Sequence, residues 1–60
     1  MTTYIHNNGD TIQTSGSCYA VTRNGITLQA DVIKWQESAE AWIDNDIRAG
    51  YYEGFKKVGN

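Results

Sequence analysis

The sequence contains little that could support a covalent or metal-based scaffold. Its 60 residues include one cysteine, Cys18, and one histidine, His6. A single thiol cannot form an internal disulfide, and one cysteine with one histidine cannot supply the ligands of a structural zinc site. Proline is absent altogether, and this absence excludes no fold class.

Long apolar runs and export signals are also missing. No apolar stretch approaches the roughly 20 residues that cross a membrane, and the first five residues form neither a basic nor an apolar region of a signal peptide. We therefore expect no membrane association. A free thiol without an export signal is typical of a reducing compartment, so we expect a cytoplasmic protein.

What is present favours a folded chain. Residues 1–60 are short enough to form one domain, which buries only about 60% of its unfolded surface. Hydrophobic residues make up 40% of the chain and charged residues 20%, a balance that favours folding over disorder. Stability then rests on an aromatic core, on self-association or on a partner. The seven aromatic residues favour the first route, and a homodimer is an alternative.

Two Asn-Gly pairs, Asn8-Gly9 and Asn24-Gly25, divide the first half of the chain. Asn-Gly suits a type I′ turn because both central residues need positive φ. Two such turns, with the short polar link Ser15-Gly16-Ser17 between them, predict two antiparallel hairpins that join into one sheet. Their registers would align four aliphatic residues on one face, namely Ile5, Ile12, Val21 and Leu28.

The second half predicts one long amphipathic helix over residues 32–49. Asp31 is a suitable N-cap, since its carboxylate can accept a hydrogen bond from a first-turn amide, and Gly50 is a suitable C′ residue. At 100° per residue the apolar side chains form one wide arc. The residues of that arc are Val32, Ile33, Trp35, Ala39, Trp42, Ile43, Ile47 and Ala49.

The expected fold is therefore α+β. A small antiparallel sheet of three to four strands is followed by one long helix packed on it and by a short aromatic and basic C-terminal tail. Five residues should be the most buried ones, namely Val21, Leu28, Trp42, Ile43 and Ile47.

Three carboxylates on the predicted helix are a candidate binding surface. Glu37, Glu40 and Asp44 are spaced at i, i+3 and i+7, so they form an acidic stripe with few lysines to neutralise it. A solvated helix face is the simplest interpretation of such a stripe. The functional interpretation is an electrostatic contact with a basic surface on a partner protein.

Exposed aromatic side chains are the second candidate surface. Trp35 is either a core residue or an anchor at an interface, and Tyr51 and Tyr52 follow the helix. Their neighbours Lys56 and Lys57 resemble the mixture of stacking and basic residues that binds single strands. Direct binding to duplex DNA is disfavoured, because the helix that would enter a groove is acidic.

No motif carries catalytic chemistry, so we expect no enzyme activity and no cofactor. Cys18 and His6 lack an orienting carboxylate and an oxyanion hole. Asp31, Glu37 and Glu40 lack the spacing of a calcium loop. A buried thiol, a turn imidazole and solvated carboxylates are the simpler interpretations.

The short acidic chain resembles, in size and type, the small accessory proteins of bacteriophages and mobile elements. Many of these bind and block a host enzyme or defence complex. The resemblance implies a non-enzymatic inhibitor or modulator in the cytoplasm of a bacterial host, acting through the acidic helix face. The alternatives are a nucleic-acid-associated regulator that uses the basic aromatic tail, and a structural subunit of a larger assembly.

Overall fold

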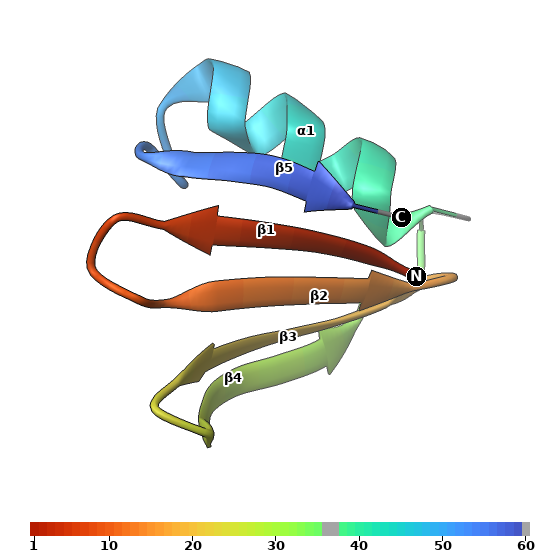
Figure 1. The fold of residues 1–60 in the computed structure, drawn as a ribbon. Helices are drawn as coiled ribbons and strands as arrows, with labels where there is room; N and C mark the ends of the chain where they lie inside the picture. The colour runs from red at the N-terminus through yellow and green to blue at the C-terminus, as the bar shows by residue number, and fades with distance from the viewer. Residues whose placement is uncertain (36–37, 60) are drawn as a thin grey trace.

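The computed structural model describes residues 1–35 and 38–59. Its elements are β1 (Thr2–His6), β2 (Thr11–Ser15), β3 (Cys18–Arg23), β4 (Ile26–Val32), α1 (Ala39–Ala49) and β5 (Phe55–Gly59). The strands form one antiparallel sheet in the order β4-β3-β2-β1-β5 (Figure 1). The α+β class is confirmed, but the sheet has five strands, where three to four were predicted.

The predicted C-terminal tail is in fact the edge strand β5. It pairs with β1, so that Lys56 lies opposite Ile5 and Phe55 lies opposite His6. The last strand of the chain is therefore the neighbour of the first. The sequence of β5 gives a weak strand signal because two of its five residues are lysines; it becomes a strand because the free edge of β1 supplies the hydrogen bonds.

The first hairpin has a different register from the one predicted. Gly9 has φ 94°, whereas Asn8 does not have positive φ, so the turn is not type I′. The amide of Gly9 donates to the carbonyl of His6 at 2.9 Å, which gives a three-residue loop with Gly9 in the left-handed region. This shifts the pairing by one residue, and such a shift turns every side chain to the other face.

Tyr4 is consequently the core residue of β1. It lies opposite Ile12 and is fully buried, whereas Ile5 lies opposite Thr11 and is 43% exposed. The next pairing, Ile12 with Val21, is as predicted, although the β2–β3 turn has only two residues, because Ser15 already pairs with Cys18.

The second hairpin contains a bulge. Asn24 (φ 52°) and Gly25 (φ 79°) both have positive φ, and Arg23 lies opposite Ile26. Val21, however, lies opposite Gln29, so Leu28 is the extra residue of the bulge. Leu28 is 52% exposed on an edge strand, and its predicted place in the core is wrong.

The helix begins seven residues later than predicted. Strand β4 continues through Val32, which pairs with Cys18, and Asp31 is a strand residue and not an N-cap. Ser38 is the N-cap, and its hydroxyl accepts a hydrogen bond from the amide of Ala41 at 3.2 Å. Residues 32–35 have the apolar periodicity of a helix, but they do not form one, because β4 continues through Val32 and makes its hydrogen bonds with β3. Within the described residues, no helix is both long and apolar enough to cross a membrane.

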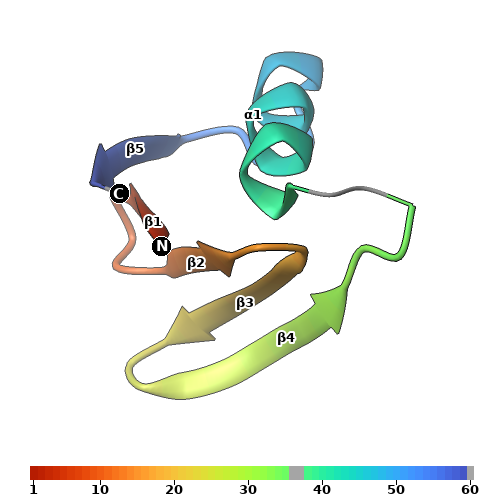
Figure 2. The same ribbon diagram turned by 90° about the vertical axis from the view of Figure 1, so that its right-hand side faces the viewer.

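Helix α1 covers one face of the sheet, over β1, β2 and β5, while β3 and β4 extend away from it (Figure 2). Tyr4, Ile12 and Ile43 form the centre of the core. Of the predicted core residues Ile43 is fully buried, and three others are partly buried against this centre, namely Val21, Trp42 and Ile47. The opposite face of the sheet carries no helix among the described residues.

Candidate functional site

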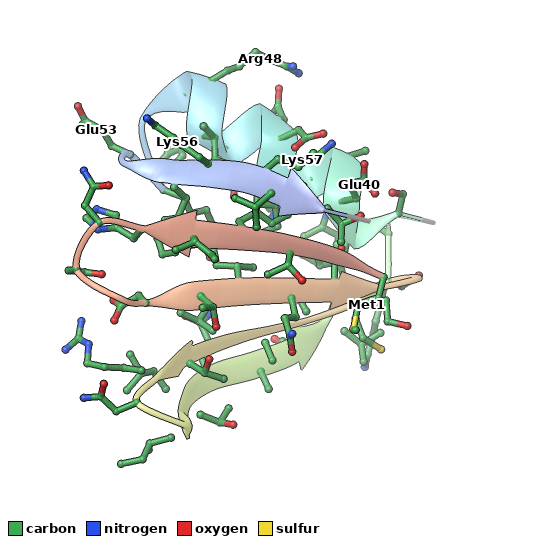
Figure 3. The ribbon with its side chains drawn as sticks, viewed as in Figure 1. Met1, Glu40, Arg48, Glu53, Lys56 and Lys57 are labelled. Atoms are coloured by element: carbon green, nitrogen blue, oxygen red, sulfur yellow. The ribbon has the colours of Figure 1, made fainter. Side chains whose placement is uncertain are left out.

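Two carboxylates of the predicted acidic stripe, Glu40 and Asp44, share one lysine of the same chain. Lys57 on β5 points to the helix, and its Nζ lies 2.7 Å from Glu40 Oε2 and 3.0 Å from Asp44 Oδ2 (Figure 3). The expectation that these carboxylates lack a lysine is therefore wrong for Glu40 and Asp44. Glu37 lies outside the described residues.

Hydrogen bonds from β1 complete this network. The hydroxyl of Tyr4 donates to Asp44 Oδ1 at 2.8 Å, and the hydroxyl of Thr2 donates to Glu40 Oε1. The hydrogen bond from Lys57, followed by the one from Thr2, lowers the pKa of Glu40. Burial raises the pKa of Tyr4, and the hydrogen bond to Asp44 adds to this rise. The polar groups at this end of α1 are thus used to join the helix to β1 and β5.

The aromatic half of the predicted site has a different geometry. Helix α1 ends with Gly50 in the left-handed region, at φ 96°. The amide of Gly50 donates to the carbonyl of Ile47 at 3.1 Å, and that of Tyr51 donates to the carbonyl of Asp46 at 2.9 Å. These two bonds define a Schellman motif, which turns the chain back toward the last helical turn. Tyr51 is thereby brought next to Asp46.

A groove results at the C-terminal end of α1. Its walls are Trp42, Asp46, Tyr51 and Tyr52; we call it the aromatic groove. Tyr51 is 79% exposed, which is unusual for so large an aromatic side chain. Trp35, which is 70% exposed, lies edge-on to Trp42 with ring centroids 5.5 Å apart. The structure therefore gathers Trp35, Tyr51 and Tyr52 around Trp42.

Trp42 and Tyr52 connect the aromatic groove to the core. Both pack against the central cluster of Tyr4, Ile12 and Ile43. Burial raises the pKa of the Tyr52 hydroxyl, and the nearby Tyr19 and Asp46 raise it further. Trp42 and Tyr52 are thus packed against the core, whereas Tyr51 in the groove wall and Trp35 beside Trp42 are exposed.

The sequence interpretation assigned neither Trp42, which it expected in the core, nor Asp46 to a site, although both line the groove. Among the residues that the structure describes, the carboxylate of Asp46 has no hydrogen-bond or ion-pair partner. Glu40 and Asp44, in contrast, share Lys57. Gly50 is the feature of the sequence that could have indicated this site, because a C′ glycine in a Schellman motif brings Asp46, four positions before it, next to Tyr51, which follows it.

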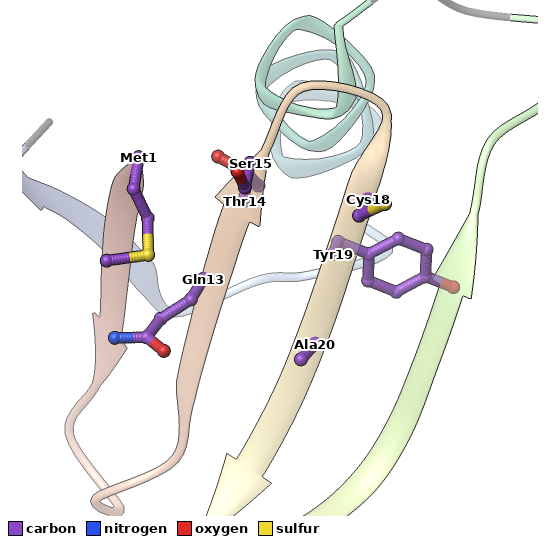
Figure 4. A pocket seen from close by; sticks show the side chains of 7 residues that line it. All are labelled: Met1, Gln13, Thr14, Ser15, Cys18, Tyr19 and Ala20. Carbon is purple, nitrogen blue, oxygen red and sulfur yellow. The ribbon is translucent and has the colours of Figure 1, made fainter.

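A second hollow lies on the open face of the sheet (Figure 4). It is lined by Met1, Gln13, Thr14, Ser15, Cys18, Tyr19 and Ala20. The Cys18 thiol is exposed, not buried as expected. His6 lies at the other end of the sheet. It follows Ile5, which pairs with the first residue of β2, whereas Cys18 pairs with the last residue of β2. The two residues are therefore not placed to act as nucleophile and base.

Within residues 1–35 and 38–59, no group of three or more His, Cys, Asp or Glu side chains is arranged to hold a metal ion. The aromatic groove combines aromatic faces with the carboxylate of Asp46. Comparison of the chain with protein-family models, with curated proteins and with solved structures found no match.

Proposed function

We propose that the protein is a non-enzymatic protein-binding module and that it binds its partner through the aromatic groove. The observation that carries this proposal is the exposure of Tyr51 in the groove wall and of Trp35 edge-on to Trp42, while Trp42 and Tyr52 pack against the core. Tryptophan and tyrosine are the residues that most often dominate binding energies at interfaces. They retain few conformational choices, so that little entropy is lost when a partner covers them.

The acidic helix face is a weaker candidate than the sequence suggested. Glu40 and Asp44 would have to exchange Lys57, Thr2 and Tyr4 for groups of the partner. Such an exchange gains little, since each carboxylate already has its hydrogen bonds. We therefore place the partner surface at the aromatic groove. The role that the size and type of the chain favour is inhibition or modulation of a bacterial host protein.

The nucleic-acid alternative loses support for a related reason. Lys57 is engaged by Glu40 and Asp44 on the helix side of β5. Adjacent strand residues point to opposite faces, so Lys56 lies on the other side of the sheet from Lys57. The two lysines therefore do not form one basic surface with Tyr51 and Tyr52.

The test is capture of a partner from a bacterial lysate by the wild type and by matched variants. Trp35→Ala with Tyr51→Ala removes the two exposed aromatic side chains of the proposed surface. Because both are exposed, the fold should be retained. Ile26→Ala with Leu28→Ala removes comparable exposed apolar surface from β4. We expect the first pair to lose the partner and the second pair to keep it. Loss with the β4 pair alone would instead support the structural-subunit alternative, with β4 as the contact.

A further inference from the structure

We infer that the aromatic groove receives an arginine side chain from a basic segment of the partner protein. This inference rests on the proposed function and specifies the chemistry of the partner. It is carried by the juxtaposition of the Asp46 carboxylate with Trp42, Tyr51 and Tyr52 in one groove. A carboxylate beside several aromatic faces matches a guanidinium group, which can pair with the first and stack on the others.

The charge of the groove is negative and uncompensated. Among the described residues its walls contain Asp46 and no lysine or arginine. The nearest basic residue of the helix, Arg48, makes no ion pair with Asp46. Lys57 is held at the opposite end of α1 by Glu40 and Asp44. In the part of the chain that the structure describes, therefore, no lysine or arginine pairs with Asp46 or lines the groove.

The helix itself adds to this preference. The groove lies at the C-terminal end of α1, where the last carbonyl groups carry partial negative charge. A cation is favoured there and an anion is disfavoured. Glu40 in the first turn and Arg48 in the last follow this rule, but Asp46, also in the last turn, does not. An arginine in the groove would compensate both the carboxylate and the helix end.

The position of Asp46 within the Schellman motif points the same way. This motif commonly brings an apolar residue of the last turn against an apolar residue after the glycine. Here the corresponding residues are Asp46 and Tyr51, whose backbones are joined by the 2.9 Å bond. A carboxylate thus replaces the usual apolar contact, and it opens the groove to a polar occupant.

Synthetic peptides test the inference directly. We would titrate the protein with a blocked Gly-Ser peptide that contains three arginines, and with the same peptide containing citrulline, the neutral analogue of arginine. The readouts are tryptophan fluorescence and the NMR shift of the Trp42 indole N–H. The arginine peptide should bind about tenfold more tightly than the citrulline peptide, because the guanidinium both pairs and stacks. Equal affinities would overturn the inference.

Two matched variants separate specific pairing from general attraction to an acidic protein. Asp46→Asn should remove most of the preference for arginine and leave binding of the citrulline peptide unchanged. Glu53→Gln removes an equal charge from the exposed turn that follows Tyr52, and it should leave the preference intact. An equal effect of both variants, or no effect of Asp46→Asn, would overturn the inference.

The captured partner distinguishes this failure from failure of the proposed function. If Trp35→Ala with Tyr51→Ala abolishes capture while Asp46→Asn does not weaken it, the groove binds the partner without an arginine and only the inference fails. If none of these variants alters capture, the proposed function fails as well. If both Asp46→Asn and the pair Trp35→Ala with Tyr51→Ala lose the partner, the proposed function and the inference are both supported.

Discussion

The ammonium group of Lys57 lies 2.7 Å from the carboxylate of Glu40, which joins the last strand of the sheet to the first turn of the helix. The same ammonium reaches Asp44 one turn later and lies 5.8 Å from the centroid of the Tyr4 ring. A residue expected in a solvated tail is therefore part of the helix–sheet interface. Because Lys57 pairs with both Glu40 and Asp44, these two carboxylates can face the sheet.

Tyr4→Phe should destabilise the protein by about 1–2 kcal/mol, because it removes a hydrogen bond to a charged group without creating a large cavity. The bond runs from the Tyr4 hydroxyl to Asp44 at 2.8 Å. Urea denaturation would measure the loss. In an Asp44→Asn background the same substitution should cost less, since the charged acceptor is gone. Equal costs in the two backgrounds would contradict a direct bond.

Acidification should unfold the protein partly through Glu40 and Asp44. The hydrogen bond from Lys57 lowers the pKa of Glu40. Burial opposes the same change at Asp44, but hydrogen bonds from Tyr4 and Lys57 lower its pKa overall. Groups with a lowered folded-state pKa contribute stability that is complete above their unfolded pKa of about 4 and is lost as the pH falls through the folded values.

The free energy of unfolding should therefore be level above about pH 5 and decline below about pH 4. Glu40→Gln with Asp44→Asn should be less stable at neutral pH and should show a shallower acid decline. The decline should not vanish, because the pKa of Asp10 is also lowered, by its hydrogen bond from Arg23. Urea titrations over a series of pH values provide the measurement; parallel curves for the two proteins would show that these carboxylates are not coupled to folding.

Ser38→Ala should cost about 1 kcal/mol, the usual loss for an N-cap side chain. Its hydroxyl accepts the bond from Ala41 in the structure. Asp31→Ala is the matched control, because Asp31 is the cap that the sequence suggests, yet it lies in β4, where its carboxylate accepts a hydrogen bond from the amide of Val32. That control should change stability by less than about 0.5 kcal/mol. The reverse order of the two effects would place the start of the helix near residue 32.

Gly54→Ala should be strongly destabilising, by about 1–3 kcal/mol from backbone strain alone. Gly54 has φ 91°, and a Cβ at this position would lie 2.3 Å from His6 Nε2. Gly59→Ala is the control in the same segment, since a Cβ there meets no heavy atom within 4 Å. Thermal unfolding of the two variants tests this prediction, and similar melting temperatures would contradict both the backbone strain and the clash with His6.

The candidate site was visible in the sequence only in part. Trp35, Tyr51 and Tyr52 are conspicuous as aromatic residues near the end of an amphipathic helix. Their gathering around Trp42 depends on the Schellman turn and on the packing of Tyr52 into the core. The ion pair of the acidic stripe with Lys57 could not be predicted, because Lys57 is 17 residues from Glu40 in sequence and comes close only when β5 joins the sheet.

The sequence by itself determined the features that depend on a few adjacent residues. These include the α+β class, the positive φ of Asn24 and Gly25, and the end of the helix at Gly50. Only the tertiary structure decided the start of α1, the register of β1 and the existence of β5. The register of β1 follows from its turn and places Tyr4 in the core, where its hydroxyl donates to Asp44 of α1. Strand β5 depends on hydrogen bonds between segments far apart in the chain, such as the pairing of Thr3 with Gly59. Local propensities of a fraction of a kcal/mol per residue do not outweigh such pairings.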